Sequence, residues 1–382
     1  MICGTRCALG LAPLRSAPGH YRKQARCGDL RIPVCLTQVN KSGTRGRHHA
    51  GMNLHPALLF LGGLVVIVLG AELLLRGATR LAVLLRVPPV VIGLTVVTVG
   101  TTMPELAVGV TAALDGNAGL AVGNIAGTNV FNILVILGLS AAVRPLPLHL
   151  LSFRLDVPVM IGAALMLIAL ASDGVLTRAD GAVLLAGALS YTLALLWLSR
   201  SESPAMRREF ASEYAAATVA PQAGLLRTRS ARAAWYLALL ATGITVTLLG
   251  AELLVQGAVA LARAYGVSDE IIGLTIVAVG TSAPELATTL VATLRNQRDV
   301  AIGNLVGSCI YNVLVILGLT AAVAPQGVVV AREVLWIDLP VAAAVAVLLL
   351  PVFRSGDSVS RREGVVFVAL YLLYLLSLVW RI

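Results

Sequence analysis

Two short polar segments with the same pattern interrupt long apolar stretches of this 382-residue chain. One is G-T-T-M-P-E, from Gly100 to Glu105, and the other is G-T-S-A-P-E, from Gly280 to Glu285. A carboxylate inside an apolar membrane helix is costly unless a partner or a wet cavity accompanies it. No Lys or Arg lies in the middle of either stretch, so a bound cation is the expected partner of both glutamates. The alternative is that both are protonated core groups held by hydrogen bonds.

A proline stands immediately before each glutamate. Pro104 and Pro284 cannot donate a hydrogen bond to the carbonyl four residues earlier, so each helix is expected to kink. The freed carbonyl oxygens are then available as ligands for a hard cation. Thr101 and Thr281 precede the glutamates by four positions, which places hydroxyl and carboxylate on one helix face.

The next apolar stretch after each hexamer carries a further polar pair at the same spacing. The pairs are Thr128 with Asn132 and Ser308 with Asn312. Neutral hydroxyl and amide groups in membrane helices also serve as packing contacts between helices, which is the alternative interpretation. Their recurrence beside both acidic hexamers favours the ligand interpretation.

Two carboxylates with hydroxyl, amide and carbonyl oxygens make a ligand set for a hard cation. Calcium fits best, because magnesium is stripped of its water less easily. The five histidines lie in the first 51 residues or at the edges of apolar stretches, so zinc hydrolysis or an H-E-x-x-H protease lacks its ligands. Cys309 is expected to pack in the interior rather than to bind a soft metal. No resident cofactor is expected.

A series of apolar segments must position these residues. Hydrophobic residues make up 58% of the sequence and charged residues 13%, against about 25% charged in soluble domains, which excludes a soluble globular enzyme. From Leu54 onward, apolar runs long enough to cross about 30 Å of hydrocarbon alternate with polar breaks. We predict an all-α membrane protein with ten transmembrane helices, at residues 56–75, 89–113, 119–142, 155–172, 181–199, 234–261, 270–293, 300–322, 334–353 and 364–380.

The sequence contains an internal repeat. Residues 70–143 align with residues 250–323 at a constant offset of 180 without a gap, and about half of the positions are identical. Five spans per copy is an odd number, so the second copy enters the membrane in the opposite orientation, as in the inverted repeats of secondary transporters. The predicted units are a basic leader (1–51), a first five-helix repeat (52–199), a loop (200–232) and a second five-helix repeat (233–382).

Charge predicts the orientation of the spans. Sixteen of the twenty Arg residues after position 51 lie on the side of the central loop, which is therefore predicted to be cytoplasmic with both termini outside. Residues 1–51 carry nine basic residues and one acid, and an external position would break this rule. We expect this leader to be disordered or absent from the mature protein. The predicted location is a bacterial inner membrane, with the lipid bilayer as surroundings and no nucleic-acid or required protein partner.

These motifs resemble those of the cation/calcium antiporters, which include the sodium/calcium exchangers, and the resemblance covers the chain from Met52. The hexamers, with G-N-I-A-G-T-N-V-F-N and G-N-L-V-G-S-C-I-Y-N, are similar to that family's two alpha-repeats. The resemblance implies that Glu105 and Glu285 coordinate calcium with the backbone carbonyls of Thr101 and Thr281. It also implies sodium sites around the carbonyls of Thr98 and Ala278 and the side chains of Thr102, Ser282, Thr128 and Ser308, with Asn132 and Asn312 between the glutamates.

Two residues depart from the family pattern. Some prokaryotic members have an acid at the position of Asn312, and serine is usual at the position of Thr102, whose extra methyl narrows a sodium site. We expect a secondary active antiporter, without covalent chemistry, that exchanges Ca²⁺ for Na⁺ by alternating access. The alternatives are a proton-coupled calcium antiporter, an exchanger of another divalent cation and, more remotely, a membrane-embedded metal-dependent enzyme.

Overall fold

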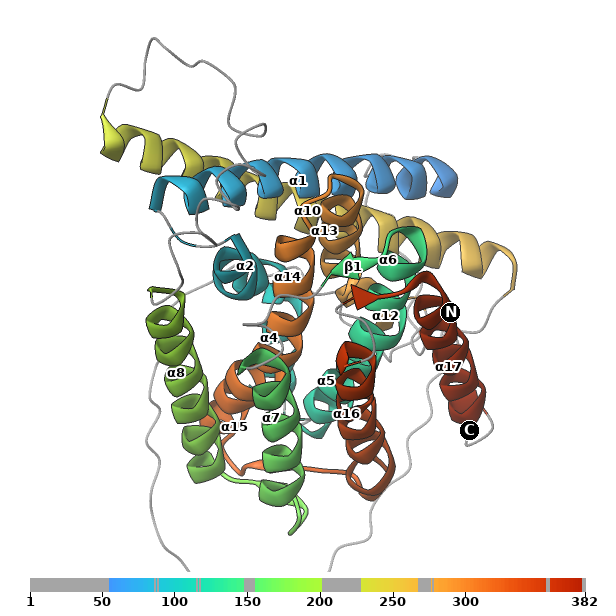
Figure 1. Ribbon diagram of the computed structural model, residues 1–382. Helices are drawn as coiled ribbons and strands as arrows, with labels where there is room; N and C mark the ends of the chain where they lie inside the picture. Colours follow the sequence, from blue (N-terminus) through green and yellow to red (C-terminus); the bar gives the residue numbers. More distant parts are fainter. Residues whose placement is uncertain are drawn as a thin grey trace, which may run out of the picture. The chain divides into compact units, whose positions relative to one another are not determined.

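The computed structural model describes residues 55–85, 87, 89–114, 116, 118–147, 155–200, 228–266, 276, 278–354 and 358–379. This part of the chain is almost entirely helical, which confirms the all-α class (Figure 1). The predicted leader at residues 1–51 and most of the predicted loop at 200–232 lie outside the described residues.

In its described residues, the first half contains two short strands and a series of helices, several of which follow one another without a break. Its helices are α1 (Pro56–Leu85), α2 (Pro89–Ile92), the π-helical turn η1 (Gly93–Val97), α3 (Thr98–Thr101), α4 (Met103–Leu114), α5 (Gly119–Phe131), the π-helical turn η2 (Asn132–Leu137), α6 (Gly138–Val143), α7 (Val157–Leu170) and α8 (Arg178–Arg200). Its strands are β1 (Leu146–Pro147) and β2 (Val175–Leu176).

The second half repeats this order from a long first helix onward. Its helices are α10 (Arg229–Ala264), α12 (Ala278–Thr281), α13 (Ala283–Leu294), α14 (Arg298–Tyr311), the π-helical turn η5 (Asn312–Leu317), α15 (Gly318–Val323), the π-helical turn η6 (Val334–Asp338), α16 (Leu339–Arg354) and α17 (Arg361–Val379). Its strands are β3 (Val328–Val329) and β4 (Ser358–Val359).

Six helices in the described residues are long and apolar enough to cross a membrane, and a bent pair of helices makes a seventh candidate. The bent pair consists of Gly93–Thr101 and Met103–Leu114, whose axes differ by 53°. Large apolar side chains such as Leu58, Trp197 and Leu373 are exposed on the surface, as a bilayer requires. The membrane class is thus confirmed, whereas the count of ten spans stays a prediction.

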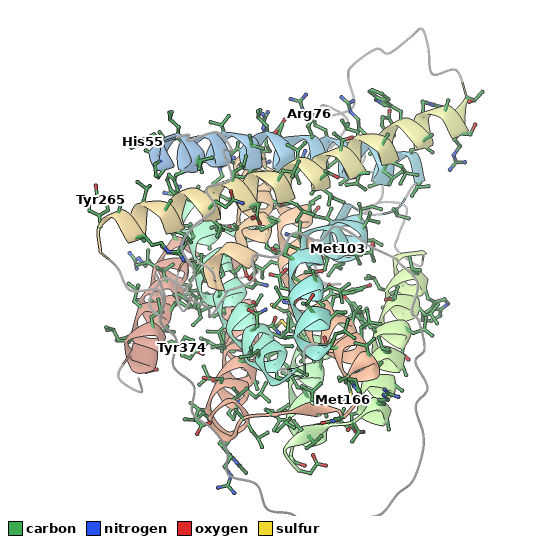
Figure 2. All side chains as sticks on the ribbon, turned by 180° about the vertical axis from the view of Figure 1, so that it is seen from behind. His55, Arg76, Met103, Met166, Tyr265 and Tyr374 are labelled. Atoms are coloured by element: carbon green, nitrogen blue, oxygen red, sulfur yellow. The ribbon has the colours of Figure 1, made fainter. Side chains whose placement is uncertain are left out.

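Helices α1 and α10 run side by side (Figures 1 and 2) and meet through glycines that recur every seven residues. A Cβ at Gly70 would collide with the backbone nitrogen of Thr247, and a Cβ at Gly250 would collide with that of Ile67. The same holds for the other glycines of the set, which are Gly63, Gly77, Gly243 and Gly257. Small residues at a regular spacing let two membrane helices approach closely. This contact explains why α1 continues to Leu85, beyond the predicted end at residue 75.

Two small antiparallel ladders connect the halves of the chain. Strand β1 pairs with β4, with Leu146 opposite Val359, and β2 pairs with β3, with Val175 opposite Val329. Each ladder thus joins one strand of the first half to one strand of the second half. The halves therefore close on each other at both ladders.

The main apolar core lies around the helices that follow the two hexamers. In an apolar segment of 18 residues within each of the helical stretches Gly119–Val143 and Arg298–Val323, 78% of the residues are buried. The corresponding fraction is 33% in α1 and 28% in α10. Helices α7 and α16 pack around this centre together with α8 and α17. The polar pairs predicted as ligands thus lie on the most deeply buried helices of the described chain.

Candidate ion-binding site

Both hexamers break their helices at the same position. Helix α3 ends at Thr101, Thr102 has the non-helical angles φ −84° and ψ 8°, and α4 begins at the next residue. Helix α12 ends at Thr281, Ser282 has φ −89° and ψ 6°, and α13 begins after it. The predicted kinks are confirmed, and in each case the proline occupies the second position of the new helix, where its missing N–H is harmless.

The two glutamates are buried and nearly without hydrogen-bond partners. Glu105 and Glu285 are each 1% exposed. Ser282 donates to Oε1 of Glu105 over 3.5 Å, whereas Oε2 of Glu105 and both carboxylate oxygens of Glu285 have no hydrogen-bond partner within the described residues. Ser282 lies only three residues before Glu285, so its contact with Glu105 brings the two hexamers together. Unpaired buried carboxylates are strongly unfavourable, so this arrangement is suited to a cation.

The two asparagines predicted between the glutamates each begin a π-helical turn. Asn132 opens η2, Asn312 opens η5, and both side chains are fully buried. The turn that begins at Asn132 packs against the helix of Glu285, and the turn that begins at Asn312 packs against the helix of Glu105. Single π-helical turns inside α-helices are common at functional sites. The segments that carry the amides and the carboxylates are thus in contact across the two halves.

Most of the predicted hydroxyl ligands are also buried. Ser308 Oγ is buried without a hydrogen-bond partner in the described part of the chain, and Thr128 is 5% exposed. Thr281 is half-buried, and Ala278 begins α12. Most of the side chains that the sequence singled out therefore face the protein interior rather than lipid.

The carbonyl of Thr98 is already occupied by protein donors. It accepts from the Thr102 backbone N–H at 3.0 Å and from the Thr102 hydroxyl at 2.9 Å. The Thr101 hydroxyl has a single proton, which it can donate either to this carbonyl at 3.3 Å or to Oδ1 of Asn304 at 3.2 Å. A cation would reach the Thr98 carbonyl after the Thr102 hydroxyl turns away, so the role of this carbonyl as a sodium ligand stays a prediction.

Asn304 is a polar residue of this region that the sequence reasoning missed. Its Oδ1 accepts from Thr101 Oγ1 at 3.2 Å, and its Nδ2 donates to Thr289 Oγ1 at 3.2 Å. Its carbonyl lies 3.3 Å from Thr98 Oγ1, whose proton also has the nearer carbonyl of Gly93 at 2.8 Å as acceptor. Gly307 permits this approach, because a Cβ there would collide with Thr98 Oγ1. The available signal was the G-N dipeptide, which recurs in both copies of the repeat.

The arrangement consists of oxygen donors on two broken helices and the two central helices beside them. Among the described residues, no group of three His, Cys, Asp or Glu side chains forms a conventional metal cluster. The charge comes from two carboxylates, and neutral hydroxyls and amides surround them. A buried, oxygen-only site of this kind inside a helical membrane protein is that of a cation transporter.

Comparison with known proteins identifies the class more closely. The model of the sodium/calcium exchanger protein family matches residues 55–197 and 235–380, and the chain belongs to this family. It is therefore an integral membrane protein of the cation antiporter class. Because its relatives are exchangers, the expectation that it is not an enzyme is confirmed.

Individual relatives align over most of their lengths. The inner membrane protein YrbG of Escherichia coli is 35% identical over 72% of this chain and 81% of its own. The sodium/calcium exchanger MaX1 of Methanosarcina acetivorans is 29% identical over 84% of this chain and 97% of its own. The solved structure of the sodium-calcium exchanger NCX_Mj, soaked with sodium in the absence of calcium, is similar with a TM-score of 0.70 and 28% identity, over 86% of this chain and all of that one.

Proposed function

We propose that this protein exchanges Ca²⁺ for Na⁺ across the membrane by alternating access, with both ions as cargo rather than as resident cofactors. The main supporting observation is that two buried carboxylates, one from each half, have three oxygens without a hydrogen-bond partner in the part of the chain that the structure describes. Such a pair is stable only with compensating positive charge. The names of the relatives MaX1 and NCX_Mj support calcium and sodium as the two ions.

The proposed ligands are those that the family resemblance implied. Glu105 and Glu285 hold calcium with the carbonyls of Thr101 and Thr281, and the amides of Asn132 and Asn312 lie between the carboxylates. Sodium occupies flanking positions, and its proposed ligands are the carbonyls of Thr98 and Ala278 and the side chains of Thr102, Ser282, Thr128 and Ser308. Burial of most of these side chains supports the assignment.

The proposed architecture is ten spans in two five-helix halves of opposite topology, 52–199 and 233–382. The two pairs of strands that join the halves, and the helix break that occurs in each half, support it. The positive-inside distribution of Arg supports a cytoplasmic central loop with both termini outside. The description of YrbG as an inner membrane protein supports a bacterial inner membrane.

The charge of the site and the type of its ligands together bear on whether sodium or protons drive the exchange. The two glutamates supply two negative charges, and the amides of Asn132 and Asn312 supply none. One Ca²⁺ or two protons neutralise this site. Sodium is favoured because buried hydroxyls such as Ser308 and Ser282 offer oxygen ligands that a proton does not need.

The test is ⁴⁵Ca²⁺ uptake by purified protein in sealed proteoliposomes. An outward Na⁺ gradient should drive uptake, and proteoliposomes that contain the Glu105→Gln variant are the matched control. Uptake driven by a proton gradient without sodium would replace this proposal with proton-coupled exchange. Uptake of another divalent cation in preference to calcium would change the cargo, and no ion-driven flux of any divalent cation would refute the antiporter.

A further inference from the structure

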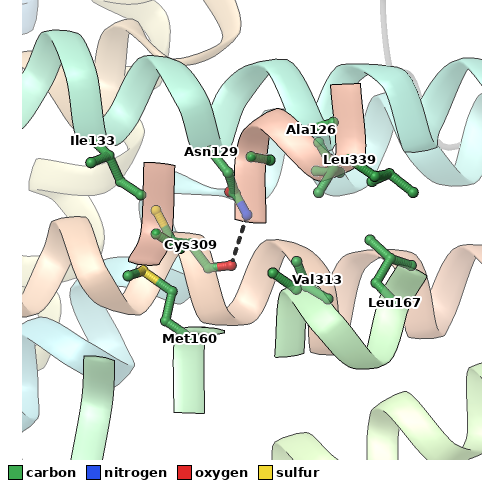
Figure 3. A pocket seen from close by; sticks show the side chains of 12 residues that line it. Ala126, Asn129, Ile133, Met160, Leu167, Cys309, Val313 and Leu339 are labelled. Atoms are coloured by element: carbon green, nitrogen blue, oxygen red, sulfur yellow. Dashed lines mark hydrogen bonds between the residues drawn. The ribbon is translucent and has the colours of Figure 1, made fainter. Parts of the chain in front are cut away.

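A chain of side-chain amides connects one end of the candidate site to a backbone carbonyl. Asn129 Nδ2 donates to the carbonyl oxygen of Cys309 at 3.1 Å, as Figure 3 shows. Asn312 Nδ2 donates to Asn129 Oδ1 at 3.0 Å. Asn129 is 8% exposed and Asn312 is fully buried, so water does not compete strongly for these bonds.

The direction of this chain is determined by its last acceptor. A backbone carbonyl can only accept, so Asn129 must turn its NH₂ group toward Cys309 and its oxygen toward Asn312. Asn312 must then donate with its own NH₂ group. Its Oδ1 is left buried, and among the described residues it has no hydrogen-bond partner. Asn312 stands on the turn that packs against the helix of Glu105. The amide of Asn312 is thereby fixed with its oxygen available as a ligand.

The equivalent amide of the first half lacks this support. At the repeat offset of 180, the counterpart of Asn129 is Cys309 itself, and the counterpart of Asn312 is Asn132. The thiol of Cys309 lies beside Asn132, and a thiol is a weak hydrogen-bond partner. Within the described residues, neither Oδ1 nor Nδ2 of Asn132 has a hydrogen bond to a nitrogen or oxygen atom. The two central amides thus differ in how firmly they are held.

We propose that Asn129 is a positioning residue that orients the amide oxygen of Asn312 toward the transported cation. The site is therefore asymmetric, with Asn312 as a constant oxygen ligand and Asn132 as an amide that is free to turn. This inference rests on the proposed exchange function, because it assigns a role within the same ion site.

The test uses Asn129→Leu, which removes both hydrogen bonds at similar size. A cavity of about 20 Å³ beside Asn129, bordered by Met160 and Leu167, gives the apolar side chain room (Figure 3). With one orienting bond lost, the Ca²⁺ concentration for half-maximal exchange should rise about fivefold to tenfold. The maximal rate should stay within about twofold, because the carboxylates that balance the charge are intact. An unchanged half-maximal concentration would overturn the proposal.

A double-mutant cycle separates positioning from a general structural effect. In an Asn312→Ala background the amide to be oriented is gone, so adding Asn129→Leu should raise the half-maximal Ca²⁺ concentration no further. Fully additive effects of the two substitutions would show that Asn129 acts independently of Asn312 and would contradict the proposal. If Asn312→Ala leaves no measurable exchange, equilibrium ⁴⁵Ca²⁺ binding to the same four proteins in detergent supplies the cycle.

The control is Cys309→Ala, a truncation at the position equivalent to Asn129. It leaves the accepting carbonyl of Cys309 in place, and the half-maximal Ca²⁺ concentration should stay within about twofold of the unsubstituted protein. A rise as large as that of Asn129→Leu would make the effect one of packing and would overturn the assignment. If Asn129→Leu does not elute as a single species, Asn129→Ser replaces it, because serine is too short to reach both partners. Absence of calcium exchange by the unsubstituted protein would instead refute the proposed function.

Discussion

The hydroxyl of Ser282 donates to Oε1 of Glu105 over 3.5 Å, although the two residues are 177 positions apart. Ser282 is the non-helical residue at the break between α12 and α13, and Glu105 lies in the first turn of α4. The two helix breaks therefore meet in space through this bond. If Glu105 binds a cation as proposed, displacement of the Ser282 hydroxyl should also affect the helix break in the other half.

The first prediction concerns the two buried carboxylates. Glu105→Gln and Glu285→Gln should each weaken Ca²⁺ binding by roughly 3 kcal/mol or more, about a hundredfold, because one of two balancing charges is lost. Without Ca²⁺, both variants should melt at a higher temperature than the unsubstituted protein, since a neutral amide replaces a buried carboxylate that lacks a compensating charge. Thermal unfolding with and without Ca²⁺ measures both effects.

The control for this experiment is Glu72→Gln. Glu72 forms ion pairs with Arg76 at 2.8 Å and with Arg295 at 2.9 Å, and both Arg side chains are more than half exposed. Loss of such exposed pairs costs about 1 kcal/mol or less, so the rise in melting temperature on adding Ca²⁺ should persist. A Ca²⁺-dependent rise retained in Glu285→Gln, or lost in Glu72→Gln, would move the site away from the two buried glutamates.

The second prediction concerns Asn304. Asn304→Leu removes the acceptor of the Thr101 hydroxyl and the donor to Thr289, and should lower the free energy of unfolding by about 1–3 kcal/mol. Because Asn304 joins Thr101 of α3 to Thr289 of α13, its loss should loosen the position of the Thr101 carbonyl proposed as a calcium ligand, and Ca²⁺ affinity should fall about tenfold. The matched control is Asn124→Leu at the equivalent, half-buried position of the first repeat, which should change either quantity much less. Equal effects at the two positions would remove the special role of Asn304.

The third prediction concerns the contact between α1 and α10. Gly70→Ala places a Cβ against the backbone and hydroxyl of Thr247, so the helices must separate along their length. Overpacking of this kind costs about 1–3 kcal/mol, and the yield of monodisperse protein should fall with the melting temperature. Gly62→Ala on the same helix is the control, because no atom lies within 4 Å of the added Cβ. The two alanine variants should therefore behave differently in size-exclusion chromatography.

The fourth prediction concerns charge movement. Three Na⁺ exceed the two glutamate charges by one, so exchange of one Ca²⁺ for three Na⁺ moves net charge and should respond to membrane potential. Exchange for two protons moves none. Proteoliposomes with a potassium-diffusion potential set by valinomycin distinguish the two, because inside-negative and inside-positive potentials should change Na⁺-driven Ca²⁺ uptake in opposite directions. Uptake indifferent to potential would exclude the three-to-one exchange.

Much of the site could be anticipated because it depends on local chemistry. A proline before a buried glutamate breaks a helix wherever the helix lies, so both breaks followed from the hexamers alone. Burial of the hydroxyls and amides likewise followed from their place within apolar stretches. The repeat related the two halves before any contact between them was known.

The rest depended on contacts that only the fold creates. Asn124 and Asn304 occupy equivalent positions in the two copies, yet only Asn304 meets Thr101 and Thr289. The resemblance implied the Thr98 carbonyl as a sodium ligand, and only the fold shows that the Thr102 hydroxyl turns back onto this carbonyl at 2.9 Å. The π-helical turns at Asn132 and Asn312 have no sequence signal comparable to a proline. The number of spans that cross the membrane stays a prediction.

The glycines between α1 and α10 have a mechanical consequence. At each glycine the backbone of the opposite helix occupies the space that a side chain would fill, and these glycines recur every seven residues on both helices. If one helix slid past the other by less than seven residues, about 10 Å, larger side chains would collide with the backbone of the opposite helix before the next glycine reached it. We therefore expect a movement of α1 along its axis to carry α10 with it. The two helices, one from each half, should then move as one unit during transport.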